Sequence, residues 1–576
     1  MKIRNVTIIL ALLFSFFAGP SAVLADMSWK GLFSSSSAKN LSSKAYYYFL
    51  LAQFAAKESR IDDAIAEYKE VISIDPDSPL LYTDLANLYI KKGEVENALH
   101  ELEKAVGKDD GYINAHLMLG DIYTMMKRKE EATVEYETVI KLDPEDHNAY
   151  LLLANLYGSS KDYDKAIETL ERLQEIKPGF VMVYYYLGRF SANNNLYQKA
   201  KGYYRKALEL SPYFYGALVD MGLVYEVTDE PEKAVEFYNK ALEVRPKNVK
   251  LRDRVARLLL RQHKLAEALQ HYKEMEQFSG DDKDTMVDAM IKTGLIYFEQ
   301  DKLEEAITKF NLIVATNPDI HRVRYFLGSA YDKRGDSEKA LAEYKKVSPE
   351  DIFYVDSLAH IVLIYKQQDK IEGAVVYIED ALENKKDDVD IYMLLANVYK
   401  EAKRLQDAVR IVEKALEIKP DSANLYFNLG VFYDEIDDTK SIDAMKKAIE
   451  LKPDHAEALN YLGYTYAEKG INLDEAEDLI IRALEVKPGS GYIVDSLGWV
   501  YYKKGEIEKA LEVLKKASGL VDNDPIVAEH LGDVYLEKGL KEKAVQAYEK
   551  SFRLNSERPD IKRKIESLRE ELKKEN

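Results

Sequence analysis

The chain has 576 residues, of which 47% are hydrophobic and 31% are charged, a balance typical of a helical protein. Its formal charge of −19 excludes a general nucleic-acid binder, which needs a basic surface, and a protein that coats anionic lipid. The chain contains no cysteine, which excludes disulfides, thiolate metal sites, thiol nucleophiles and lipid attachment to an N-terminal cysteine.

The N-terminus has the three-part layout of a secretory signal peptide. Lys2 and Arg4 precede an apolar run over residues 6–18, and Ala25 supplies a small residue for cleavage before Asp26. The apolar run is shorter than the roughly 20 residues that a membrane span needs. This layout predicts export of the chain.

We therefore predict a signal peptide over residues 1–25 and a periplasmic protein. An uncleaved anchor in the inner membrane, with the chain facing the periplasm, is the alternative. Residues 26–44 are rich in serine and are predicted to form a flexible linker.

A repeat of 34 residues runs through the first half of the chain. Its marker is an alanine, found at Ala64, Ala98, Ala132, Ala166, Ala200, Ala234 and Ala268. Twelve residues before several of these stand Leu119-Gly120, Leu153-Ala154, Leu187-Gly188 and Met221-Gly222. Twelve residues after five of the marker alanines stand prolines, namely Pro76, Pro144, Pro178, Pro212 and Pro246. Because proline ends a helix, each repeat is predicted to be two short helices that approach most closely at the small residues.

The spacing has one clear break, where four residues are inserted around residues 278–282. The repeat then resumes at Ala306, Ala340, Ala374, Ala408, Ser441, Ala476, Ala510 and Ala544. We predict fifteen repeats in two segments, 45–280 and 281–556, with a candidate hinge near Gly280. Residues 557–576 place Ile561, Ile565 and Leu568 on one face and are predicted to be a capping helix.

The pattern resembles the tetratricopeptide repeat over about nine-tenths of the chain. Residues 494–517 show it most fully, with Leu497-Gly498, Tyr501, Ala510, Leu514 and Ala517. The resemblance implies an all-α, right-handed superhelical solenoid of antiparallel helix pairs, with a concave groove lined by the first helix of each pair. The family's tryptophan at the fourth position is replaced by Tyr48, Tyr82, Tyr150, Tyr184 and Val494, which we expect to fill the same apolar space.

A narrower resemblance concerns residues 458–517. They read A-L-N-Y-L-G-Y-T-Y-A-E-K-G and, further on, D-S-L-G-W-V-Y-Y-K-K-G. This block is similar to one in exported bacterial tetratricopeptide proteins, including outer-membrane adaptors of carboxy-terminal-processing proteases. Those adaptors carry a lipidated cysteine, which this chain lacks.

The sequence contains no motif for catalysis, nucleotide binding, zinc or calcium. Its nine histidines are scattered, without the spacing of metal ligands. We therefore predict a protein that is not an enzyme and that uses no cofactor and no metal.

By helical periodicity and the family's geometry, the side chains at five positions of each first helix face the groove. They give as partner-binding candidates Tyr185, Arg189, Lys250, Arg257, Arg261, Phe427, Asn460, Tyr464, Tyr492, Asp495, Trp499 and Tyr502. The basic set suits an acidic peptide or a terminal carboxylate, unless it pairs with neighbouring glutamates. The aromatic and amide set suits an extended or helical peptide, unless the rings pack against the next repeat; Trp499 is the first choice.

A carboxylate clamp, which holds the tails of chaperones in some repeat proteins, is incomplete here. Asn397 and Asn428 stand at the places of the two clamp asparagines. Met393 and Glu457 replace the lysines, and Tyr461 replaces the arginine, so we reject this interpretation.

The sequence thus predicts a non-enzymatic scaffold or adaptor of the bacterial cell envelope that binds peptides or proteins in its groove. The expected partners are other proteins, such as an envelope protease or an export complex. No nucleic acid is expected, and no membrane contact beyond an uncleaved N-terminal anchor. The alternative is a subunit of an envelope polysaccharide-export or secretion assembly, in which the array holds the complex together.

Overall fold

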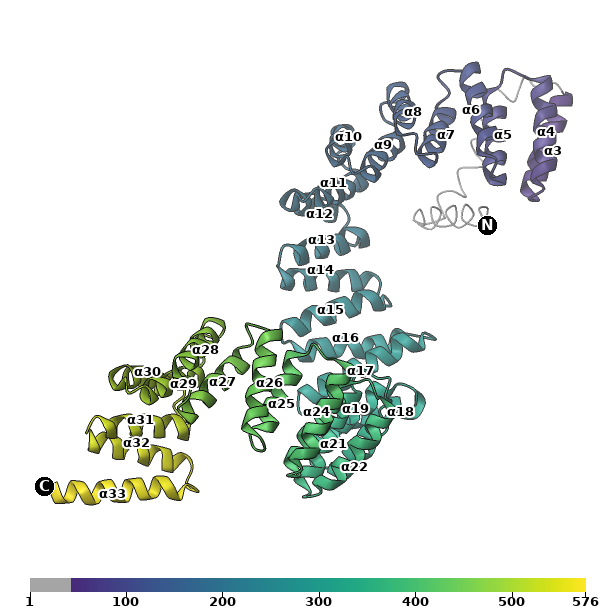
Figure 1. The fold of residues 1–576 in the computed structure, drawn as a ribbon. Helices are drawn as coiled ribbons and strands as arrows, with labels where there is room; N and C mark the ends of the chain where they lie inside the picture. Colours follow the sequence, from purple (N-terminus) through teal and green to yellow (C-terminus); the bar gives the residue numbers. More distant parts are fainter. Residues whose placement is uncertain (1–42, 576) are drawn as a thin grey trace. The chain divides into compact units, whose positions relative to one another are not determined.

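The computed structural model describes residues 43–575, and in this range it contains helices and no strand (Figure 1). The predicted signal peptide, its cleavage between Ala25 and Asp26, and all but the end of the predicted linker lie outside the described residues. The chain divides into two compact units. The first ends at Asp281 and the second begins at Asp282, inside the insertion that breaks the repeat spacing.

The described part of the first unit consists of seven antiparallel helix pairs. In chain order they are α3 (Ser43–Lys57) with α4 (Ile61–Ile74), α5 (Pro79–Lys92) with α6 (Val95–Lys108), α7 (Ile113–Met125) with α8 (Lys129–Leu142), α9 (His147–Ser159) with α10 (Tyr163–Ile176), α11 (Val181–Asn193) with α12 (Tyr197–Leu210), α13 (Tyr215–Val227) with α14 (Pro231–Val244), and α15 (Val249–Arg261) with α16 (Leu265–Phe278).

The second unit continues with eight pairs and a final single helix. These are α17 (Lys283–Glu299) with α18 (Leu303–Thr316), α19 (His321–Arg334) with α20 (Ser337–Tyr344), α21 (Tyr354–Gln367) with α22 (Ile371–Asn384), α23 (Val389–Glu401) with α24 (Leu405–Ile418), α25 (Ala423–Tyr433) with α26 (Asp438–Leu451), α27 (Ala456–Lys469) with α28 (Leu473–Val486), α29 (Gly491–Lys503) with α30 (Ile507–Leu520), α31 (Pro525–Glu537) with α32 (Lys541–Leu554), and α33 (Pro559–Glu575).

The fifteen pairs confirm the predicted all-α solenoid. The marker alanines explain why the helices can approach so closely: each of them, from Ala64 to Ala544, is fully buried, and Ser441 takes the same place in the repeat that lacks one residue. Each pair packs on the next along the chain within its unit, and clusters of buried hydrophobic residues extend across repeat boundaries.

The contact inside a pair depends on matched sizes. A Cβ atom built on Gly188 of α11 would lie 2.6 Å from the ring of Tyr204 on α12, and one on Gly532 would lie 2.6 Å from the ring of Tyr548. Both rings are fully buried, so neither can move aside. A glycine on the first helix therefore makes room for an aromatic ring four residues after the marker alanine of the second helix.

In several repeats the tyrosine four residues after the marker alanine also donates a hydrogen bond from its hydroxyl group to a carboxylate. Tyr68 on α4 donates a hydrogen bond of 2.9 Å to Asp84 on α5, in the next repeat. Tyr136 donates to Asp121 at 2.7 Å. Burial raises the pKa of Asp84 to about 6, although the hydrogen bond from Tyr68 acts in the opposite direction. The link between the first two repeats thus contains a carboxyl group that titrates near neutrality.

Replacing Asp84 by asparagine should stabilise the protein at pH 7.5 but hardly at pH 4. A raised carboxyl pKa favours the folded state only while the group is protonated. This contribution is full below the ordinary pKa of 3.8 and is lost as the pH rises through about 6. Asparagine keeps the acceptor for Tyr68 and removes the charge. Thermal melts of both proteins at both pH values measure the effect, and an equal difference in Tm at the two pH values would contradict it.

One second helix is much shorter than the repeat predicts. α20 has eight residues, and the loop that follows contains Pro349 and the side chain of Ile352, which is 84% exposed. The residue before a proline avoids helical backbone angles, which explains why the helix does not resume before α21.

The first helices line the inner side of each unit. In the first unit α5 contacts α7 and α11 contacts α13, whereas second helices of neighbouring repeats come no closer than marginal contact. In the second unit α27 contacts α29 and α29 contacts α31. A stack whose first helices are closer together than its second helices curves toward the first helices. We call the surface formed by the first helices the inner face.

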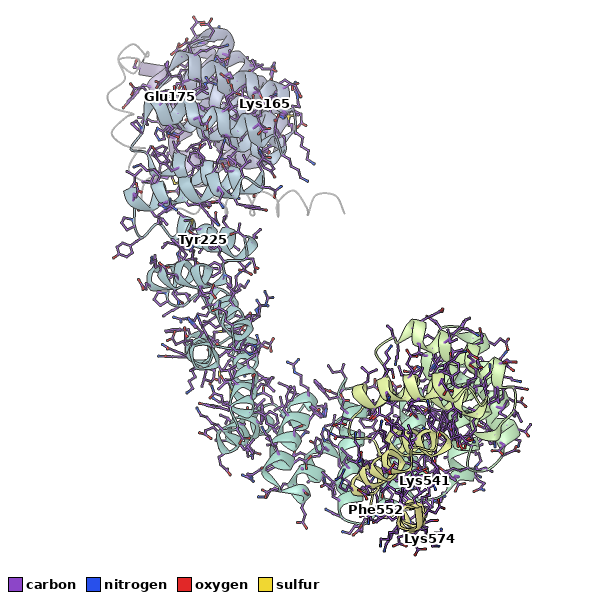
Figure 2. All side chains as sticks on the ribbon, turned by 90° about the vertical axis from the view of Figure 1, so that its left-hand side faces the viewer. Lys165, Glu175, Tyr225, Lys541, Phe552 and Lys574 are labelled. Carbon is purple, nitrogen blue, oxygen red and sulfur yellow. The ribbon has the colours of Figure 1, made fainter. Side chains whose placement is uncertain are left out.

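The last helix closes the second unit. Ile561, Ile565 and Leu568 of α33 are buried against α32, and Lys541 of α32, labelled in Figure 2, pairs with Glu571 of α33 at 3.2 Å. The other side of α33 carries exposed charged residues, among them Lys562, Arg563, Glu566, Arg569 and Glu570. This polar outer side is what the end of a solenoid needs.

Candidate functional site

The predicted groove residues on α11 are Tyr185 and Arg189. The ring of Tyr185 is half-buried, with its centroid 5.0 Å from that of Phe214 in the next repeat. Burial and the nearby carboxylate of Asp220 raise the pKa of Tyr185. Arg189 is exposed. Tyr185 therefore packs against the following repeat, and Arg189 is the accessible member of this pair.

The strongest concentration of positive charge lies on α15, at the end of the first unit. This helix carries five basic residues and a single acid, Asp253. Arg252 is buried, where it pairs with Glu274 and donates to the carbonyl oxygen of Pro246 at 2.9 Å. The other basic residues are Lys250, Arg254, Arg257 and Arg261.

Two of these side chains have acidic neighbours. Arg254 Nε lies 2.7 Å from Glu226 Oε2 on α13, and Arg257 Nη2 lies 2.9 Å from Asp253 Oδ2. Burial acts to raise the pKa of Glu226, but hydrogen bonds from Arg254 and Tyr238 outweigh it and hold that pKa below its usual value. Glu226 is therefore ionised and neutralises Arg254.

Charge remains available beyond these pairs. The Arg257 side chain is 62% exposed even in its ion pair, and Lys250 and Arg261 are exposed without an ion pair in the part of the chain that the structure describes. An exposed pair within one helix contributes little and exchanges readily. Lys250, Arg257 and Arg261, which we call the basic patch, can thus bind an anionic group with arginine fork geometry.

Aromatic rings of α13, the first helix before α15, make stacking and cation–π contacts. Tyr225 on α13, labelled in Figure 2, stacks on Phe237 with 5.4 Å between ring centroids, and Lys201 Nζ lies 4.5 Å from its centroid. Arg245, just before α15, lies 4.1 Å from the ring centroid of Tyr215.

Two of the seven predicted residues of the second unit, Trp499 and Asp495, are buried inside it. The indole of Trp499 on α29 is 7% exposed; it stacks on His530 of α31 at 3.9 Å and on Tyr502 at 4.8 Å between centroids, and its Nε1–H donates to Glu468 of α27. Because α27, α29 and α31 contact one another, this position is covered. The indole of Trp499 is therefore packed against neighbouring repeats, which is the alternative that the sequence left open, and it is not part of an open binding surface.

Asp495 is 5% exposed, and its Oδ2 lies 2.9 Å from Nδ1 of His530. It too belongs to the interior, against its assignment to the groove. Tyr464 and Tyr502 are half-buried, and burial together with Glu468 and Asp495 raises the pKa of Tyr464.

Of the remaining three candidates, two are half-buried and one is exposed. Phe427 is half-buried and lies 5.3 Å from His455 between ring centroids. Asn460 has a buried Oδ1 without a hydrogen-bond partner among the described residues. Tyr492, at the start of α29, is 58% exposed and is the most accessible aromatic ring of this set.

Sequence reasoning missed an ionic network at the end of the second unit. Glu529 of α31 pairs with Arg558 at 2.6 Å and with Lys564 of α33 at 3.3 Å, and Lys564 also pairs with Asp533 at 2.7 Å. It also missed His530. Both could have been found by comparing first-helix residues one repeat apart, since Asp495 and His530 are separated by 35 positions.

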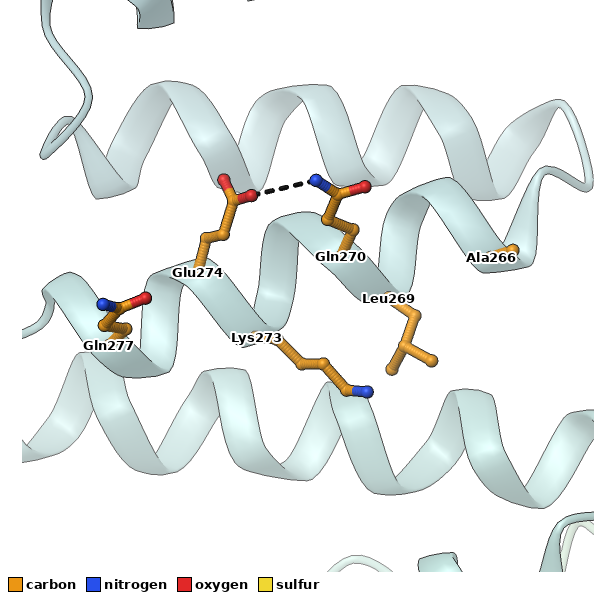
Figure 3. Close-up of a pocket in the computed structure, with 6 residues that line it drawn as sticks. All are labelled: Ala266, Leu269, Gln270, Lys273, Glu274 and Gln277. Carbon is orange, nitrogen blue, oxygen red and sulfur yellow. Dashed lines mark hydrogen bonds between the residues drawn. The ribbon is translucent and has the colours of Figure 1, made fainter.

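A shallow hollow of about 300 Å³ lies on α16 (Figure 3). It is lined by Ala266, Leu269, Gln270, Lys273, Glu274 and Gln277, all from this one helix, and Gln270 donates to Glu274 at 3.1 Å. A surface built from one helix offers no converging groups, so it is not a candidate for chemistry.

Residues 43–575 bring together no cluster of histidine or acidic side chains that could hold a metal ion. In the same range no helix has both the length and the apolar character to cross a bilayer.

Comparison with protein families decides the identity of the repeats. Models described as "TPR repeat" or "Tetratricopeptide repeat" match residues 56–93, 80–107, 113–146, 130–184, 183–214, 215–248, 291–352, 365–431, 423–455, 444–478 and 496–559. These ranges together cover more than half of the chain and lie in both units. The chain is a tetratricopeptide-repeat protein.

Three solved structures illustrate what this tetratricopeptide-repeat protein is similar to. The Cut9–Hcn1 hetero-tetramer of APC/C is 15% identical, with 79% of this chain and 96% of that chain covered and a TM-score of 0.35. Yeast Tom70 is 17% identical, with coverage of 74% and 96% and a TM-score of 0.36. MamA from Desulfovibrio magneticus RS-1 is 20% identical, with coverage of 30% and 96% and a TM-score of 0.27. A comparison with curated proteins gave no match.

Membership of this family has a general functional meaning. Tetratricopeptide-repeat arrays are scaffolds for protein–protein interaction, and their exposed inner face is the surface on which partners are held. In this tetratricopeptide-repeat protein the inner face differs along the chain. It is open and basic at α15, and it is filled by its own side chains at α27, α29 and α31.

Proposed function

We propose that this tetratricopeptide-repeat protein is a non-enzymatic scaffold of the bacterial cell envelope that binds an acidic segment of a partner protein on the inner face of its first unit. The observation that carries the proposal is the basic patch on α15. Lys250, Arg257 and Arg261 stay exposed in a chain whose formal charge is −19. Such a local reversal of charge attracts an acidic peptide or a terminal carboxylate and fixes its position.

The location in the envelope rests on the N-terminal sequence. Lys2, Arg4 and the apolar run over residues 6–18 favour export, and Ala25 favours cleavage before Asp26. Fractionation of the host cell, with mass spectrometry of the purified chain, tests this part. A periplasmic protein that begins at Asp26 supports it, and a full-length chain recovered from the cytoplasm contradicts it.

The nature of the partner follows from the narrower resemblance of residues 458–517 to envelope adaptors. It supports an envelope protease, or another protein of an export complex, as the partner that the scaffold holds. An acidic tail or loop on that partner is the feature that would fit α15.

Charge reversal at the basic patch tests the binding site. The double variant Arg257→Glu/Arg261→Glu should lower the recovery of the partner in a pull-down from the envelope fraction by about tenfold or more, because each lost charge-assisted hydrogen bond is worth about 1.5–3 kcal/mol.

The matched control changes the same charges elsewhere. Lys199→Glu/Arg205→Glu alters two exposed residues of α12, a second helix, and should leave recovery unchanged. Equal losses in both double variants would show that net charge, and not the patch, controls binding.

A further inference from the structure

The first described helix has an apolar face that nothing in residues 43–575 covers. On α3, Tyr47 is 59% exposed, Leu50 49% and Phe54 57%. Its opposite side is buried against α4 through small residues, including Ala45 and Ala52. Two aromatic rings and a leucine in a row on one face of a helix are an unusual outer surface for a protein in water.

The register of the repeats shows what this face is built for. Moving from Tyr47 in steps of 34 residues reaches Leu81, Ala115, Ala149, Val183, Ala217 and Leu251. The same steps from Phe54 reach Leu88, Ile122, Leu156, Phe190, Val224 and Leu258. All twelve side chains are buried. The Tyr47 and Phe54 positions of this face are therefore interior in every later repeat of the first unit, and the Leu50 position is half-buried in each of them.

In those repeats the covering element is the second helix of the repeat before. α4 packs on α5, α6 on α7, and so on to α14 on α15. α3 has the same face and lacks such a neighbour among the described residues. The end of the second unit differs, because there α33 presents its charged side outward. The described part of the first unit thus begins without the polar end that a solenoid requires.

We propose that residues 27–33 of the same chain cover this face and act as the N-terminal cap of the first unit. The segment reads M-S-W-K-G-L-F, with Trp29, Leu32 and Phe33 at the spacing of one helical face. Residues 34–42 join it to α3 and can reach about 30 Å when extended. α3 has 15 residues and is about 22 Å long, so the segment can reach any part of the face.

Two arguments favour this occupant over a second copy of the chain. A stable interface between proteins needs about 20–30 residues from each partner, far more than one helical face supplies. A tethered segment needs no such area, because its effective concentration is in the millimolar range. α3 also carries Lys44 and Lys57 near its two ends and no acidic residue, so two copies packed antiparallel on this face would bring like charges together.

Fluorescence tests the proposal directly, because Trp29 and Trp499 are the chain's two tryptophans. In the chain beginning at residue 26, Trp499→Phe leaves Trp29 as the single indole. We expect Trp29 to emit at shorter wavelength than a free indole and to be shielded from acrylamide. Leu50→Glu should shift its emission to longer wavelength. Val134→Glu, which changes a side chain 62% exposed on α8, should not.

A second measurement uses the absence of cysteine. A single cysteine introduced as Phe54→Cys should react several-fold faster with a thiol reagent when Trp29, Leu32 and Phe33 are all changed to serine. Circular dichroism confirms that each variant stays helical. An indole that is fully exposed in the parent, or one that ignores Leu50→Glu, would overturn the proposal. So would a dimer in sedimentation that depends on Leu50, because a second copy would then be the occupant.

Discussion

Replacing Gly188 by leucine should destabilise the first unit by about 3 kcal/mol. Its Cβ atom would lie 2.6 Å from two ring carbons of Tyr204, which is 1% exposed. The ring has no free space to enter, so α11 and α12 would have to separate and break the contact on which the pair depends. Urea denaturation followed by circular dichroism measures the loss.

The control for this variant lies on the partner helix. Gly202 sits in the interior of α12 with nothing within 4 Å of a built Cβ atom, so Gly202→Leu should be neutral or stabilising by up to about 1 kcal/mol. Because contacts in a solenoid are between neighbours, Gly188→Leu should also reduce hydrogen-exchange protection mainly in α11–α14, leaving the second unit unchanged. Equal destabilisation by both variants would show that close packing at Gly188 is not the cause.

Trp499→Ala should cost about 3–5 kcal/mol, the usual loss when a buried aromatic ring is removed. The change removes the stacking of the indole on His530 and Tyr502 and the hydrogen bond that its Nε1–H donates to Glu468. These contacts join α27, α29 and α31. Hydrogen exchange should then increase in these three helices. The binding of a partner at α15 should not change.

Tyr492→Ala is the control on the same helix. Its ring is 58% exposed, so its removal should alter stability by no more than about 0.5 kcal/mol. A different result would contradict this interpretation. If Trp499→Ala changed stability as little as Tyr492→Ala and abolished partner binding, Trp499 would be a binding residue.

The sequence was enough to predict the helix pairs, because each marker alanine stands where two helices nearly touch. The spacing of Ala64 to Ala268 predicts seven of the pairs that the structure contains. The sequence also contains the match between Gly188 and Tyr204. The glycine stands twelve residues before Ala200 and the tyrosine four residues after it, and the two are in contact in the structure. The short helix α20 was not predicted, because the marker at Ala340 says nothing about the length of its helix.

The inner face was predicted less well than the fold. Periodicity states which side of a helix a residue occupies, and it placed Lys250, Arg257 and Arg261 on an exposed surface. It does not state how closely the next first helix approaches. At α27, α29 and α31 these helices touch, so Trp499 and Asp495 became interior residues. That distance depends on the packing of several repeats together.

Photo-crosslinking in the host cell is the most direct test of binding at the inner face of α15. A photoreactive residue replaces Leu260, the half-buried neighbour of Arg261 on α15, in one strain and Arg205 of α12 in another, so that the basic patch stays intact. We expect a defined envelope protein with an acidic segment to be captured from position 260 and not from position 205. Capture of the same proteins from both positions, or of none from position 260, would contradict the account.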